Sequence, residues 1–355
     1  MKVGILSMQR VINYGSFLQA YALKNLIECL GHDAYFVDIK KGEQLAFITR
    51  KVSPVRKIKF SELPKRIEHV FYVKKRDKLF REYLFEKYGI NSPKEESDLD
   101  YLVVGSDEVF NCLQRSSWGV SLQLFGNTSV PSISYAASCG YTTYEKLHEM
   151  GVSDVIADSL RRYKAISVRD NNTVKVVRDV SGVEPLMHLD PVLVYDWKKE
   201  TDGVECKFKD YILVYGYDNR INDEKEIFAI KAFAKKHGKK LISFGVYQRW
   251  CDKNVMCDPF QLIKYFMMAD YVITETFHGT VLSIKCNKPF AAIVRDSNRN
   301  KMLDLLSKFG LEGRATEISQ LNSILESPIN YSVVNEIIKK EKERTIEYLN
   351  SNIKL

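Results

Sequence analysis

The sequence predicts an α/β protein of two doubly wound, Rossmann-like domains with mostly parallel sheets. Short apolar runs typical of buried strands alternate with amphipathic helical stretches throughout the chain. The alternation starts again after "HLDPVLVYDWKKETDGVE" (188–205), and 355 residues exceed what a single hydrophobic core usually accommodates. We therefore expect an N-terminal domain at 1–195 and a C-terminal domain at 196–330, joined at the polar segment 196–209.

The strands and helices are predicted from these patterns in chain order. The expected strands are VGILSM (3–8), AYFVDI (34–39), YLVVGS (101–106), SISYAAS (132–138), AISVRD (165–170), YILVYGY (211–217), KLISFGVY (240–247), YVITET (271–276) and FAAIV (290–294). The clearest helix is 16–30, which has apolar residues at helical spacing and is stopped by Gly31. Further helices are expected near 222–236, 258–268, 279–286, 299–309 and 331–350. The last segment, 331–355, is expected to pack back across both domains.

One segment carries the positive charge of the chain. The net charge is +8, and residues 50–81 alone hold twelve Lys and Arg against three acidic residues. We expect this block to be helical and to belong, within 50–90, to the N-terminal domain. It either attracts phosphates, on an anionic membrane face or a polyanionic ligand, or forms a solvated pair of helices with basic outer faces. Nucleic acid is not expected, because no recognition motif accompanies the charge.

Several functional classes are disfavoured by composition. The apolar run at the N-terminus, from Val3 to Ser7, is too short for a signal-peptide core, and no run approaches the length of a membrane span. A cytoplasmic protein is expected, at the inner membrane face if the basic block binds lipid. The seven cysteines contain no CxxC pair and the six histidines are scattered. Neither a metal site nor a disulfide framework is predicted.

The loops after the strands are where an α/β sheet binds ligands. After the first strand, Asn13, Tyr14 and Gly15 form a polar turn that can present backbone N–H groups, although a plain strand-to-helix turn would look similar. There is no GxGxxG, so a dinucleotide site is not supported. After the third strand, Ser106, Asp107 and Asn111 suit hydrogen bonding to sugar hydroxyls. The alternative there is a simple helix cap.

Arginine 169 follows the fifth strand. A guanidinium at the exit of an apolar strand is suited to bidentate contact with a carboxylate or phosphate. The ordinary alternative is a salt bridge with Asp170 or Asp190. Both interpretations stay open from the sequence.

The segment "TETFHGT" ends strand 271–276 and starts a helix with His278, Gly279 and Thr280. Donors at a helix N-terminus favour an anion, and an imidazole beside them can transfer a proton. Thr280 either caps the helix or binds the same anion. A structural histidine is the alternative.

Seven segments together resemble the polysaccharide pyruvyl transferase family, in the family's order and over almost the whole chain. They are "NYGSFLQAYAL" (13–23), "DYLVVGSDEVFN" (100–111), "ISYAASCG" (133–140), "ISVRD" (166–170), "LDPVLVYDW" (189–197), "TFHGTVLSIKCNKPF" (276–290) and "KMLDLLSKFGLEGR" (301–314).

The resemblance implies a GT-B-like arrangement with the site in the cleft between an N-terminal acceptor domain and a C-terminal donor domain. It implies transfer of pyruvate from phosphoenolpyruvate, a co-substrate rather than a cofactor, onto a sugar of a polysaccharide or lipid-linked oligosaccharide as a cyclic ketal. By motif, His278 matches a histidine that acts as general acid or holds the donor. Arg169 matches an arginine that binds the donor's anionic groups, and Asp107 is the candidate base or acceptor ligand.

The sequence departs from the family pattern at two donor positions. Thr276 stands where some members have arginine, and Lys301 stands where an arginine is often found, with Arg299 two residues earlier. Either cation could supply the charge, together with the helix that opens at Gly279.

Two other functions stay open. One is a GT-B glycosyltransferase that uses a nucleotide-sugar, for which Glu275 is the nearby candidate ribose ligand. The other is a non-catalytic protein that binds a carbohydrate or an anion.

Overall fold

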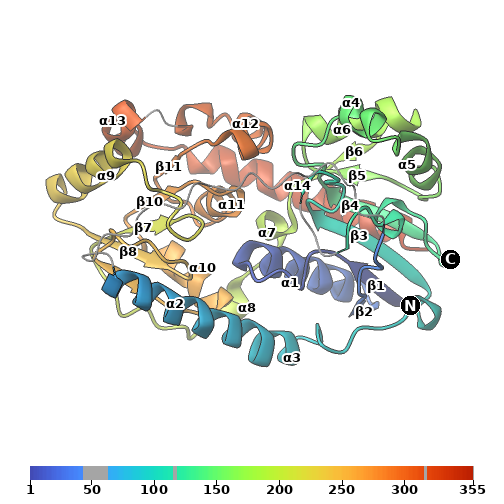
Figure 1. The fold of residues 1–355 in the computed structure, drawn as a ribbon, viewed down its shortest axis with the longest axis horizontal. Coiled ribbons are helices and arrows are strands. Elements are labelled where there is room, and N and C mark those ends of the chain that lie inside the picture. Colours follow the sequence, from blue (N-terminus) through green and yellow to red (C-terminus); the bar gives the residue numbers. More distant parts are fainter. Residues whose placement is uncertain (43–62, 115–117, 316–317, 355) are drawn as a thin grey trace. The chain divides into compact units, whose positions relative to one another are not determined.

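A computed structural model describes residues 1–42, 63–114, 118–315 and 318–354 (Figure 1). The chain forms two compact units. The described residues of the first unit lie within 1–42, 85–195 and 336–354, and those of the second lie within 63–84 and 196–335. Each unit contains one parallel sheet with its own helices.

The first unit is built on a six-stranded parallel sheet in the order β2-β1-β3-β4-β5-β6. Its strands are β1 (Lys2–Leu6), β2 (Asp33–Phe36), β3 (Tyr101–Asp107), β4 (Ser132–Ala137), β5 (Ser167–Val168) and β6 (Leu186–Met187). Its helices are α1 (Tyr14–Cys29), α3 (Phe85–Lys87), α4 (Tyr144–Glu149), α5 (Ser153–Leu160), α6 (Asn171–Ser181) and α7 (Pro191–Val194). Every residue of β3 and β4 is buried, as expected for central strands of a parallel sheet that is covered on both faces.

The second unit is built on a five-stranded parallel sheet in the order β11-β10-β7-β8-β9. Its strands are β7 (Tyr211–Tyr215), β8 (Lys240–Phe244), β9 (Lys253–Val255), β10 (Tyr271–Thr274) and β11 (Phe290–Ala292). Its helices are α2 (Leu63–Lys78), α8 (Lys198–Thr201), α9 (Glu224–Lys236), α10 (Pro259–Met268), α11 (Phe277–Lys285), α12 (Arg299–Lys308) and α13 (Leu321–Glu326). All five residues of the central strand β7 are buried.

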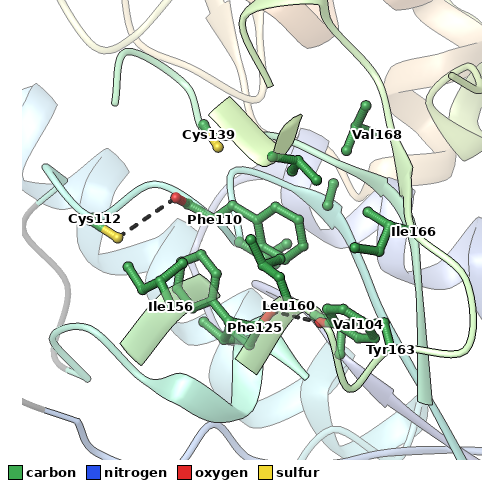
Figure 2. Close-up of a cluster of buried hydrophobic side chains, with 14 of the residues drawn as sticks. Val104, Phe110, Cys112, Phe125, Cys139, Ile156, Leu160, Tyr163, Ile166 and Val168 are labelled. Carbon is green, nitrogen blue, oxygen red and sulfur yellow. Dashed lines mark hydrogen bonds between the residues drawn. The ribbon is translucent and has the colours of Figure 1, made fainter. Parts of the chain in front are cut away.

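Aromatic and aliphatic side chains fill the core of the first unit on one side of its sheet (Figure 2). The rings of Phe110 and Phe125 stack at a centroid distance of 5.1 Å. Tyr163 is buried beside them, and its hydroxyl donates to the carbonyl of Leu124 at 2.7 Å. The bond satisfies the one polar group that this ring brings into the core.

All nine strands expected from the sequence are present, so the prediction of two doubly wound domains is confirmed. The predicted helices 16–30, 222–236, 258–268, 279–286, 299–309 and 331–350 are present as well, with ends shifted by a few residues. Two strands were missed, β6 and β9. They have two and three residues, none of them buried, so neither gives the apolar run by which the others were recognised.

The basic segment belongs to a different unit from the one expected. The sequence predicts that 50–90 belongs to the N-terminal domain, but α2 lies with the second unit. The Tyr72 hydroxyl donates to the carbonyl of Val255 at 3.0 Å, and the guanidinium of Arg76 lies 2.8 Å from the carboxylate of Asp218. Residues 50–62 of the segment lie outside the described residues.

The last helix, α14 (Tyr331–Asn352), begins in the second unit, and its residues from Glu336 onward belong to the first. Tyr348 is buried, and its hydroxyl donates to the carbonyl of Ser134 in β4 at 2.8 Å. Nearby, the Tyr135 hydroxyl donates to the carbonyl of Leu189 and lies 3.0 Å from the hydroxyl of Thr345. These bonds tie the end of the chain to the central strands of the first sheet.

We predict that Tyr348→Phe destabilises the first unit by about 1–2 kcal/mol, because the carbonyl of Ser134 loses a buried donor while the ring is kept. The measurement is urea unfolding followed by circular dichroism. An unchanged midpoint would mean that this bond adds nothing to the docking of the helix.

Candidate functional site

Three strands of the first sheet, β3, β5 and β6, deliver charged side chains to its carboxyl edge. Asp107 is the last residue of β3, Arg169 follows β5, and Asp190 follows β6 as the N-cap of α7. Asp107 has a φ of +80°, in the left-handed region that aspartate tolerates better than most residues. Strain of this kind is found at functional positions when the surrounding contacts hold it in place.

The guanidinium of Arg169 lies between two carboxylates. Its Nη1 is 2.8 Å from Asp190 Oδ2, and its Nη2 is 3.3 Å from Asp107 Oδ1. The Arg169 side chain is only 2% exposed. Asp107 also accepts a hydrogen bond from the Ser16 hydroxyl at 2.8 Å, which connects the cluster to α1.

The neighbouring carboxylates favour the charged form of the Arg169 guanidinium. Burial lowers the pKa of the Arg169 guanidinium, but the carboxylates of Asp107, Asp190, Glu108 and Asp170 outweigh burial and raise that pKa above its usual value. Asp170 behaves differently, because burial raises the pKa of its carboxyl despite hydrogen bonds from neighbouring hydroxyls. The salt bridge with Asp190, named as the ordinary alternative for Arg169, is therefore present, and the guanidinium is already committed to protein carboxylates.

The turn after β1 serves as the start of α1. Asn13 is the N-cap, and its side-chain oxygen accepts hydrogen bonds from the backbone N–H groups of Gly15 and Ser16. Tyr14 and Gly15 are buried in the first turn. The segment thus has the structure of a plain strand-to-helix turn, the alternative named for it, and an acceptor role for these residues stays a prediction.

The other two acceptor candidates of the first unit also have partners. Ser106 is fully buried, and its hydroxyl donates to the carbonyl of Ala136 in β4 at 2.9 Å. The amide of Asn111 donates to Glu108 at 2.7 Å and accepts from the Thr142 hydroxyl at 2.9 Å. Their polar groups hold the loops of the sheet edge in shape.

At the carboxyl edge of the second sheet, His278 lies in the first turn of α11, directly after β10. The residue is 9% exposed. Its ring meets the ring of Phe277 edge-on at a centroid distance of 5.4 Å. A histidine at this position faces the positive end of the helix dipole, where an anion is favoured.

The N-cap of α11 is Thr276, not Thr280. The Thr276 side chain accepts the backbone N–H of Gly279 at 3.0 Å, and the Thr280 hydroxyl donates to the carbonyl of Thr276 at 3.2 Å. A Cβ on Gly279 would lie 2.0 Å from the hydroxyl of Thr274, so glycine allows the helix to approach the strand. Gly279 and Thr280, both expected to bind the donor, thus have structural contacts.

The two candidate cations of α12 differ in their surroundings. The Lys301 ammonium lies over the ring of Phe277, 5.7 Å from its centroid. Because Phe277 directly precedes His278, this ammonium is near the start of α11. Arg299 is half exposed and lies 3.5 Å from the carboxylate of Asp296 on the same surface. Of the two, Lys301 is the one that the structure brings to the start of α11.

An ion-pair network at this edge was not predicted from the sequence. Glu275, with a fully buried side chain, follows β10, and Arg295 follows β11. Arg295 pairs with Glu275 at 3.1 Å and with Glu226 at 2.7 Å, while Arg220 lies 3.4 Å from Glu275. Burial raises the pKa of the Glu275 carboxyl despite these cations. The sequence did contain a signal for Arg295, because this arginine follows an apolar strand, as Arg169 does.

Two further features concern the described part of the chain only. Within it, no three side chains of His, Cys, Asp or Glu are grouped so that they could hold a metal ion. The helices of the same residues include none with the length and apolar character that crossing a bilayer requires.

Comparison with known proteins identifies the family. The model of the family described as polysaccharide pyruvyl transferase matches residues 13–297. The chain belongs to this family, as its motifs indicated. Among curated proteins, none matches the chain.

Solved structures support the fold. The chain is similar to UGT89C1 of Arabidopsis thaliana complexed with quercetin, at 11% identity and a TM-score of 0.51, covering 99% of this chain and 98% of that chain. It is similar to the spinosyn forosaminyltransferase SpnP at 10% identity and a TM-score of 0.51, with 99% of both chains covered. The two Rossmann-like units are thus those of the GT-B fold, and at this identity the likeness concerns the fold alone.

We predict that Arg169→Met destabilises the protein by about 3–5 kcal/mol, because it leaves two buried carboxylates without their cation. Adding Asp190→Asn should restore part of the loss, since one of the unpaired charges is then removed. Urea midpoints of the single and double variants measure both effects. A double variant no more stable than Arg169→Met would contradict the coupling of these residues.

Proposed function

We propose that this protein transfers pyruvate from phosphoenolpyruvate onto two hydroxyls of one sugar, in a polysaccharide or a lipid-linked oligosaccharide, to form a cyclic ketal. The observation that carries the proposal is a family match over residues 13–297 that includes a histidine at a helix N-terminus. Family membership supports transfer of a pyruvyl group. The donor, the ketal product and the roles of the residues below are proposed.

The donor is assigned to the carboxyl edge of the second sheet. Phosphoenolpyruvate carries about three negative charges at neutral pH, so its site needs cations and N–H donors. The N-terminal turn of α11 and the ammonium of Lys301 beside Phe277 supply positive potential there. His278, in the same turn, is the residue suited to protonate the bound donor.

The reaction needs one proton donor and one base. Its atoms and electrons balance without an oxidant, a reductant or a water molecule. His278 in its charged form gives a proton to the methylene carbon C3 of the donor, which becomes a methyl group, and C2 becomes electrophilic. The first sugar hydroxyl adds to C2 and gives its proton to the base. The bond between C2 and the phosphate oxygen breaks and inorganic phosphate leaves. The second hydroxyl then adds to C2, and its proton goes to the departing phosphate. Holding both hydroxyls against one carbon is where we expect most of the acceleration.

Asp107 is the proposed base or acceptor ligand. Arg169 and Ser16 hold its carboxylate in one orientation. Arg169 is therefore proposed to act through Asp107 as a positioning residue. A direct donor contact, as the family motif implied, would bring a trianion next to the two carboxylates with which Arg169 already pairs.

The glycosyltransferase alternative has little support from the second unit. It calls for a carboxylate that can receive the ribose hydroxyls of a nucleotide, and Glu275 was the candidate. Its side chain is fully buried, one oxygen accepts the N–H of Tyr217, and the other pairs with Arg295. Neither oxygen is available to a ribose without breaking this network.

A melting-temperature screen separates the three functions. Phosphoenolpyruvate is expected to stabilise the folded protein, because a ligand that binds only the native state raises its stability. Stabilisation by nucleotide-sugars alone would favour the glycosyltransferase. Stabilisation by phosphoenolpyruvate without any product in the transfer assay would favour a binding protein.

We predict that His278→Gln lowers turnover by roughly 10²–10⁴-fold, the usual contribution of a general acid. The measurement is mass spectrometry of candidate glycans incubated with enzyme and phosphoenolpyruvate, read as the added pyruvyl group. His148→Gln, on the exposed surface of α4, is the matched control and should keep full activity. A His278→Gln enzyme that is folded and fully active would remove the assignment.

We predict that Lys301→Met raises the KM for phosphoenolpyruvate by at least about tenfold, because one cation is lost beside α11. Arg299→Met removes the same charge two residues away, where it already pairs with Asp296, and should change KM much less. Steady-state kinetics of the two variants measure the difference. If Arg299→Met raised the KM for phosphoenolpyruvate more than Lys301→Met, the donor contact would be assigned to Arg299.

A further inference from the structure

Helix α2 has an apolar stripe on its outer face. Leu63, Ile67, Val70 and Phe71 follow each other at helical spacing and are 45%, 50%, 51% and 67% exposed. The other exposed large apolar residues of the described chain are scattered singly over different elements: Tyr83, Tyr141, Val155, Leu186, Tyr217, Phe228, Met268 and Val333. A contiguous apolar stripe on a soluble surface usually marks an interaction site.

The opposite face of α2 fastens the helix to the second unit. Tyr72 donates to the carbonyl of Val255, and Arg76 pairs with Asp218. The ring of His69 lies 5.0 Å from the ring of Tyr247, and Lys65 donates to the carbonyl of Arg249 at 2.6 Å. With its polar and aromatic face bound, the helix is held with its apolar stripe outward.

A cationic cavity adjoins the stripe. Its volume is about 770 Å³, and it lies between α2, the middle of α9 and the loops after β7 and β8. Four of its lining residues are cations: Lys65, Arg66, Lys231 and Arg249. Val70 lines the cavity and belongs to the stripe, so the two features are continuous.

The described residues that line this cavity include no aspartate or glutamate, although the ring of His69, which lines it, lies 3.6 Å from the carboxylate of Asp218. In the described chain, Lys65, Arg66 and Lys231 form no salt bridge. Cations gathered in a concave site without carboxylates raise the local concentration of anions.

We propose that α2 is a membrane-docking helix: its apolar stripe enters the interface of an anionic bilayer, and the cationic cavity beside it binds a lipid phosphate. Apolar and basic surfaces side by side on one helix are typical of helices that lie in a membrane interface. A free phosphate would explain the cavity but not the stripe. A protein partner would explain the stripe but not four cations.

The charge along α2 supports a lipid surface. Within 63–78 there are six Lys and Arg against two acidic residues, Glu68 and Asp77, which leaves a surplus of four. The outer face continues beyond Phe71 with Lys74 and Lys78, both exposed. Each such cation near an anionic surface adds to the attraction. The surface potential and the apolar stripe therefore act in the same direction.

The test is sedimentation of the full-length protein with vesicles of phosphatidylcholine alone or mixed with phosphatidylglycerol, without donor or acceptor. Wild type is expected to bind only the anionic vesicles. Arg66→Gln with Lys231→Gln should lower the partition coefficient by about tenfold or more. Lys235→Gln with Lys240→Gln removes the same charge from exposed positions outside the cavity and should have a much smaller effect.

Two stripe variants separate insertion from simple attraction. Ile67→Ser with Phe71→Ser should weaken binding, whereas Phe228→Ser with Val333→Ser, exposed apolar residues elsewhere, should not. Ile67→Lys with Phe71→Lys adds charge but removes the stripe. Insertion predicts weaker binding of this variant than of wild type, and attraction alone predicts tighter binding.

Three results would overturn the proposal. One is that every stripe variant binds the vesicles as strongly as wild type, which would mean that something other than a membrane covers the stripe. Another is tighter binding of the lysine variant. The third is a wild type that is stabilised by inorganic pyrophosphate but does not bind vesicles, which makes the cavity a site for soluble anions. Because no donor or acceptor is present, the outcome is independent of pyruvyl transfer.

Discussion

The buried guanidinium of Arg169 is the constraint on which the functional edge of the first unit depends. It is paired with Asp107 at the end of β3 and with Asp190 at the start of α7, so one side chain connects the exits of three strands. Removing three charges from water is expensive, and only close pairing offsets the cost. Asp107, whose backbone is left-handed, has its carboxylate held by this guanidinium and by the hydroxyl of Ser16.

Most of the fold could be predicted because buried parallel strands are continuous apolar runs and because local signals end helices. Gly31 follows α1, as expected from its chemistry, whereas the N-cap is Asn13 and the helix begins at Tyr14, two residues before the predicted start at Ser16. The unit to which α2 belongs could not be predicted. It depends on contacts of Tyr72 and Arg76 with residues more than a hundred positions away, which no local pattern encodes.

The candidate site could be predicted in position but not in detail. The rule that ligands bind at the carboxyl ends of strands led to Asp107, Arg169 and His278, which all lie there. The rule does not say whether a polar group is already used by the protein. Gly279 and Ser106 form hydrogen bonds within the fold. Only the folded structure distinguishes Lys301, which lies near Phe277, from Arg299, which pairs with Asp296.

The charges at the two sheet edges suggest a division of roles between the units. At the first edge, one guanidinium interacts with four carboxyl groups, those of Asp107, Asp190, Glu108 and Asp170. Such an edge repels a trianion but suits a neutral sugar, whose hydroxyls need an acceptor for their protons. At the second edge, the start of α11 carries the positive end of a helix dipole, with His278 in its first turn and Lys301 nearby. The anionic donor is therefore better suited to the second unit and the sugar to the first, an assignment that requires no cation from Arg169.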